Sequence, residues 1–66
     1  MNDNPKEEAV RLLALSTEQS IRSAVAHEMV VDSKFTDIAA AENALKSAVM
    51  ATEARKAAAN LLASSK

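Results

Sequence analysis

The chain has 66 residues, a formal net charge of −1 at pH 7 from 8 basic and 9 acidic residues, and neither cysteine nor glycine. The lack of cysteine excludes disulfides and cysteine metal sites, and the lack of glycine excludes a glycine-rich phosphate loop. Charges of both signs are mixed along the chain, so no cationic block indicates nucleic acid or an anionic lipid surface.

The apolar residues are numerous but small. Fifteen are Ala, and Val, Leu, Ile, Met and Phe together number 17. Burying one of the larger side chains contributes roughly 1.5–3 kcal/mol, whereas ordering each residue costs roughly 1.5 kcal/mol. We therefore expect residues 1–66 to form one small domain that is marginally stable alone and that associates with itself or with a larger partner.

The first predicted element is a helix over residues 5–31. Asn4 is placed as its N-cap and Pro5 as its first helical residue, and Glu7 three residues after Asn4 completes a capping-box pattern. Larger apolar residues recur at helical spacing along one side of this segment, although Thr17 and Glu28 interrupt the pattern.

A turn is predicted over residues 32–36 and a second helix over residues 37–63. Thr36 is the favoured N-cap of the second helix, with Asp32 or Ser33 as alternatives. Alanine dominates this helix, and neither glycine nor proline interrupts it. Because the turn lacks glycine, the usual left-handed C-cap is not expected, and one long bent helix remains an alternative.

Two helices of nearly equal length, about 40 Å at 1.5 Å per residue, joined by a short turn predict an all-α antiparallel helical hairpin. We further expect two hairpins to assemble into a dimeric four-helix bundle. With the turn near Lys34, facing residues have numbers that add up to about 68. Thr17 then lies opposite Ala51 and Thr52, where the polar gaps of the two apolar stripes meet.

Three sets of apolar residues are candidate binding surfaces. The predicted interface for self-association or for a partner comprises Val10, Leu13, Ile21, Val25, Ile38, Ala41, Leu45, Ala48 and Val49. A second apolar surface is predicted on the other side of the first helix and comprises Leu12, Leu15 and Val30. An apolar tip at the turn, which either closes the end of the bundle or is offered to a partner, comprises Met29, Val31 and Phe35.

Alanine also repeats every seven residues at Ala44, Ala51 and Ala58. Small side chains at this spacing allow two helices to approach closely. The alternative interpretation is that these alanines only favour helix on a solvated surface.

No residue pattern indicates catalysis. His27 and Glu28 are adjacent on the predicted helix and point in different directions, so they do not form a dyad. His27 also lacks a second metal ligand three or four residues away. We therefore predict no enzyme activity, no metal, no cofactor and no small-molecule ligand.

The predicted function is that of a protein–protein interaction module, such as an adaptor, an inhibitor or a chaperone. The architecture is similar to that of small helical hairpins found among co-chaperones of bacterial secretion needles and among plasmid- or phage-encoded regulators. Two alternatives follow: an obligate subunit that folds only with a larger partner, and a dimeric nucleic-acid-binding regulator. The polar start MNDNPKEE and the short apolar runs predict a soluble cytoplasmic protein, although leaderless export would leave no recognisable signal.

Overall fold

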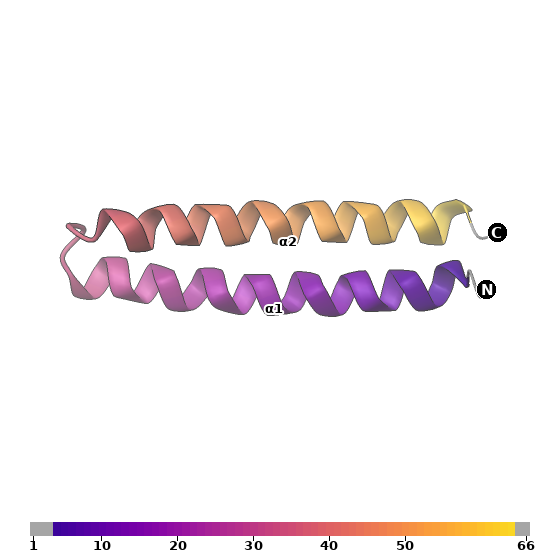
Figure 1. Ribbon diagram of the computed structural model, residues 1–66, viewed down its shortest axis with the longest axis horizontal. Helices are drawn as coiled ribbons and strands as arrows, with labels where there is room; N and C mark the ends of the chain where they lie inside the picture. Colours follow the sequence, from indigo (N-terminus) through magenta and orange to yellow (C-terminus); the bar gives the residue numbers. More distant parts are fainter. Residues whose placement is uncertain (1–3, 65–66) are drawn as a thin grey trace.

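The computed structural model describes residues 4–64, which form two helices joined by a five-residue turn. Helix α1 spans Pro5–Asp32 and helix α2 spans Ile38–Ser64. The helices lie side by side and antiparallel, so that the start of α1 and the end of α2 are at the end of the hairpin opposite the turn (Figure 1). The predicted all-α helical hairpin is thus confirmed, with helix ends within one residue of those expected.

The N-cap of α1 is Asn4, as the sequence predicts. The side-chain oxygen of Asn4 accepts hydrogen bonds from the backbone N–H groups of Lys6, at 3.0 Å, and of Glu7, at 3.4 Å. Pro5 occupies the first helical position, where no intrahelical N–H bond is needed. Glu7 and Glu8 lie in the first turn, where negative charge is favourable beside the helix dipole.

The start of α2 differs from the prediction. Asp37, and not Thr36, is the N-cap: its carboxylate accepts a hydrogen bond of 3.0 Å from the N–H of Ala40, three residues on. The Thr36 hydroxyl instead donates to the Ser33 carbonyl oxygen. Ser33 caps the C-terminal end of α1, and its hydroxyl oxygen accepts from the Asp37 N–H. Ser33 thus caps the end of α1, and Asp37 caps the start of α2.

The turn also contains the left-handed cap that the absence of glycine argued against. Lys34 and Phe35 have φ angles of 56° and 67°. The Phe35 N–H donates to the Val30 carbonyl at 2.8 Å, and the Lys34 N–H donates to the Val31 carbonyl at 2.9 Å. These are the two hydrogen bonds of a Schellman motif. Here the bonds of the motif hold two non-glycine residues in a conformation that costs each of them energy.

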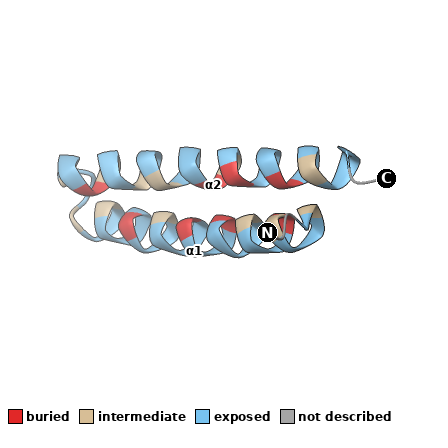
Figure 2. Ribbon diagram, turned by 45° about the vertical axis from the view of Figure 1, so that its right-hand side comes forward, coloured by how far each residue is buried: buried red, intermediate tan, exposed pale blue. Residues whose placement is uncertain are grey.

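The contact between the helices is a seam made mostly of small side chains. Along the inner side of each helix, residues with little exposure recur at alternating intervals of three and four, the spacing of a coiled coil (Figure 2). On α1 the seam comprises Ala9, Leu12, Ser16, Gln19, Ser23, Ala26 and Val30. On α2 it comprises Ala40, Ala44, Ser47, Ala51, Ala54, Ala58 and Leu61. Every buried hydrophobic residue of the described chain is an alanine.

Two hydrogen bonds fix the register of the seam. The Ser16 hydroxyl donates to the carbonyl oxygen of Ala51, and the Ser23 hydroxyl donates to that of Ala44, both at 2.9 Å. Facing residues therefore have numbers that add up to 67, one less than predicted. The seven-residue repeat of alanine in α2 does mark the edge where the helices approach closely, because Ala44, Ala51 and Ala58 all lie in the seam.

Candidate protein-binding surfaces

The two helices form a layer one helix thick, with the seam between two opposite faces. Arg22 and Met29 of α1 line a shallow groove together with Asn43 and Lys46 of α2, so these residues share one face. Residues seven positions apart lie in line along a coiled-coil helix. Glu8 and Leu15 are therefore in line with Arg22, and Glu53 is in line with Lys46.

We call this surface the charged face. It comprises Glu8, Arg11, Leu15, Glu18, Arg22, Val25 and Met29 of α1 and Asn43, Lys46, Met50 and Glu53 of α2. Arg11 Nη1 lies 2.6 Å from Glu8 Oε1, and Arg22 Nη2 lies 3.4 Å from Glu18 Oε2. Arg11, Glu18 and Arg22 are exposed and Glu8 is half-exposed, so each pair contributes only a few tenths of a kcal/mol.

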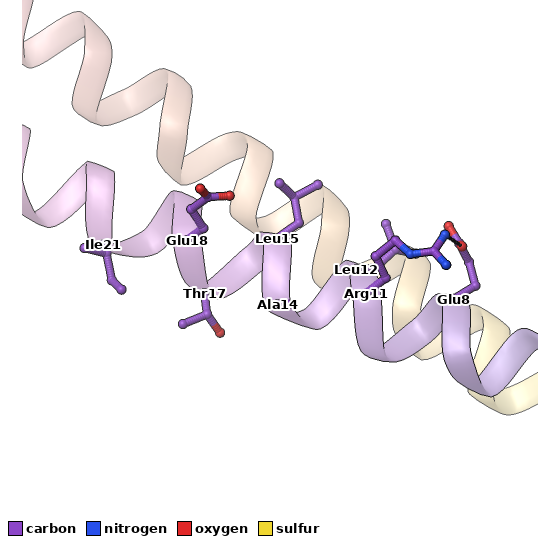
Figure 3. Close-up of a pocket in the computed structure, with 8 residues that line it drawn as sticks. All are labelled: Glu8, Arg11, Leu12, Ala14, Leu15, Thr17, Glu18 and Ile21. Carbon is purple, nitrogen blue, oxygen red and sulfur yellow. Dashed lines mark hydrogen bonds and ion pairs between the residues drawn. The ribbon is translucent and has the colours of Figure 1, made fainter.

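A shallow hollow along α1 adjoins the charged face. It is lined by Glu8, Arg11, Leu12, Ala14, Leu15, Thr17, Glu18 and Ile21 (Figure 3). Thr17 and Ile21 point to the opposite side of the helix from Leu15 and Glu18. The lining side chains therefore do not converge on a common point, and we assign no ligand to the hollow.

The opposite surface, which we call the apolar face, carries almost no charge. On α1 it comprises Val10, Leu13, Thr17, Ser20, Ala24, His27 and Val31. On α2 it comprises Ile38, Ala41, Leu45, Ala48, Thr52, Ala59 and Leu62. Lys6 and Arg55, both in the half of the hairpin away from the turn, are its only Lys or Arg within residues 4–64, and no Asp or Glu lies among these positions. Four uncharged polar positions lie among the apolar ones: Thr17, Ser20, His27 and Thr52.

Six of the nine residues of the predicted interface lie on the apolar face: Val10, Leu13, Ile38, Ala41, Leu45 and Ala48. Ile21 and Val49 project from the backs of their helices, away from the seam, and Val25 lies on the charged face. Ala41 is half-buried beside the seam, and the other eight are exposed. The set therefore does not hold α1 against α2. It lies on the outer surface of the hairpin, and its role in binding another chain stays a prediction.

The structure separates the predicted second apolar surface. Leu12 and Val30 are half-buried in the seam, whereas Leu15 is exposed on the charged face. At the turn, Met29, Val31 and Phe35 are all exposed, and Phe35 has 72% of its surface accessible. Val31 and Ile38 continue the apolar face to this end of the hairpin.

Only part of the seam was predicted from the sequence, namely the alanine repeat of Ala44, Ala51 and Ala58. Gln19 and Ser16 are buried in it, although neither belongs to an apolar stripe. The sequence signal for the seam is a set of mostly small, uncharged residues at alternating spacings of three and four in both helices. None of the seam positions from Ala9 to Val30, or from Ala40 to Leu61, holds a charged residue. Glu28 and Arg55, by contrast, interrupt the stripes of larger residues.

The residues considered for catalysis and metal binding form no such site. His27 is exposed on the apolar face. Within residues 4–64, no three side chains of His, Cys, Asp or Glu gather closely enough to hold a metal ion. Neither α1 nor α2 combines the length and apolar character needed to cross a membrane.

Comparison with known proteins gives no family to which these surfaces can be referred. No protein-family model matches the chain, and neither a curated protein nor a solved structure is significantly similar to it.

Proposed function

We propose that the protein is a protein-binding module whose exposed apolar side chains bind another polypeptide chain. The observation that carries this proposal is the inversion of side-chain size between the inside and the outside. Within residues 4–64 the buried hydrophobic residues are all alanines, whereas thirteen larger hydrophobic residues are exposed. Isolated exposed apolar residues are common, but a face that carries larger apolar side chains along both helices and almost no charge is typical of a surface that binds a partner.

Energetics support the same function. No large side chain of the described residues is fully buried in the hairpin, so the largest hydrophobic contributions, roughly 1.5–3 kcal/mol for each fully buried side chain, are missing from the isolated chain. Ordering each residue costs roughly 1.5 kcal/mol. A partner that covers the apolar face supplies the missing burial, and folding is then coupled to binding.

The experiment is sedimentation equilibrium together with circular dichroism on the same samples across a wide concentration range. We expect helicity to depend on association: the chain is strongly helical when bound to a partner and weakly helical as a dilute monomer. A monomer that remains fully helical and melts cooperatively at the lowest concentration would contradict the proposal, because such a hairpin needs no partner to fold.

A further inference from the structure

We infer that the partner on the apolar face is a second copy of this chain, packed with its turn pointing in the opposite direction to form a four-helix bundle. This inference rests on the proposed function and specifies its partner.

The distribution of charge selects the face. Both side-chain ion pairs of the described residues lie on the charged face, where they would be desolvated at a cost if a partner covered them. The apolar face has no acidic residue, and its two cations lie in the half away from the turn. The apolar face can therefore be covered without burying an ion pair.

The area of the face suits a second hairpin. The hairpin is 48 Å long, and two adjacent helices are together about 20 Å wide with their side chains. The face therefore offers on the order of 900 Å², close to the roughly 800 Å² that each partner buries in a stable interface of standard size. An identical hairpin has the same length and width, so it covers the whole face with its own.

The two cations select the direction. If both turns lay at the same end, Lys6 and Arg55 of both copies would gather at the other end with no acidic residue on the face to balance them. In the opposite arrangement, each α2 lies antiparallel across the other α2, with the midpoint near Ala48. Arg55 of one copy then comes level with Glu42 of the other. Glu42 is in line with Val49 on the back of α2, beside the apolar face, so the arrangement brings a carboxylate nearer to each Arg55.

Side-chain sizes are compatible with this arrangement. Around the same midpoint, Leu45 of one copy comes level with Thr52 of the other, and Ile38 comes level with Ala59. Across the two α1 helices, Leu13 comes level with Ala24. In these three pairs a larger side chain faces a smaller one, which allows the two layers to interdigitate there.

The face is tested with a matched pair of substitutions. Leu45 on the apolar face and Met50 on the charged face are both exposed in α2, at 69% and 44%. We expect Leu45→Asp to weaken dimerisation by about 100-fold or more, because it buries two unpaired carboxylates in the interface. Met50→Asp introduces the same charge and should leave the dimerisation constant within a few-fold. Equal effects of the two substitutions would overturn the inference.

The direction is tested by a distance. The chain has no cysteine, so Thr36→Cys in the turn carries a single spin label. Pulsed electron paramagnetic resonance should give a label separation close to the 48 Å length of the hairpin. A separation of about 20 Å, roughly two helix diameters, would place both turns at one end and overturn the inference.

The mass of the unlabelled chain separates failure of this inference from failure of the proposed function. A poorly helical monomer at all concentrations overturns the inference of a second copy, while the need for another protein partner stands. A cooperatively folded monomer overturns both. A helical dimer with the substitution pattern and label distance given above supports both.

Discussion

The hydroxyl of Ser16 on α1 donates a hydrogen bond of 2.9 Å to the carbonyl oxygen of Ala51 on α2. A serine side chain extends only one atom beyond Cβ, so the bond requires the backbone of α2 to lie close against α1. The Ser23 hydroxyl repeats the contact with Ala44 one heptad away. Close approach of two helices needs small residues at the contact, and both helices supply alanine and serine there.

Enlarging the seam should therefore destabilise the hairpin. Ala51, which is 4% exposed, has no room for a larger side chain, and we expect Ala51→Leu to lower the free energy of unfolding by about 1–3 kcal/mol through overpacking. The measurement is urea denaturation at one fixed protein concentration, because association also changes apparent stability.

The control for this substitution is Ala57→Leu, which makes the same change at an exposed position of α2. It should change the free energy of unfolding by less than about 0.5 kcal/mol, as surface substitutions usually do. Comparable losses in the two variants would show that Ala51 does not lie at a close helix contact.

A glycine at a left-handed position of the turn should stabilise the protein. Lys34 has a φ of 56°, a conformation that glycine adopts without the steric penalty of a Cβ atom. We expect Lys34→Gly to raise the free energy of unfolding by about 1 kcal/mol, seen as a higher melting temperature at equal protein concentration. Lys34→Ala removes the same charge while keeping Cβ, and an equal gain in that variant would attribute the effect to charge.

The identity of the second N-cap predicts an asymmetric pair of effects. Asp37→Ala removes the acceptor for the Ala40 N–H, and we expect it to lower the free energy of unfolding by about 1 kcal/mol. Thr36→Ala removes only the hydroxyl bond to Ser33 within the turn and should cost less. Thermal melts of both variants decide the question, and a larger loss for Thr36→Ala would restore Thr36 as the more important capping residue.

The ion pair between Glu18 and Arg22 should contribute little. Their side chains are 57% and 62% exposed, so we expect a coupling energy of about 0.2–0.5 kcal/mol that falls with added salt. A double-mutant cycle with Glu18→Gln and Arg22→Gln measures this energy directly. A coupling above about 1 kcal/mol would mean that the pair is less solvated than its exposure indicates.

The sequence by itself determined the helices, the position of the turn and the register to within one residue. These features depend on local signals. Asn4 and Pro5 mark the start of α1, a polar segment separates the helices, and the nearly equal helix lengths fix which residues face each other. Each signal acts within a few residues of where it is read, so no knowledge of tertiary contacts was needed.

Tertiary structure alone decided which side of each helix faces the other. The hydrophobic pattern favoured the side with the larger residues, such as Ile21 and Leu45, because burial of larger side chains releases more free energy. The hairpin instead packs through Ser16, Ala51 and their heptad neighbours, since close backbone contact and interhelical hydrogen bonds depend on small side chains from both helices at once. The heptad spacing of Ala44, Ala51 and Ala58 marks one side of this contact in the sequence. That the small residues pack in preference to the larger ones is a property of the pair of helices.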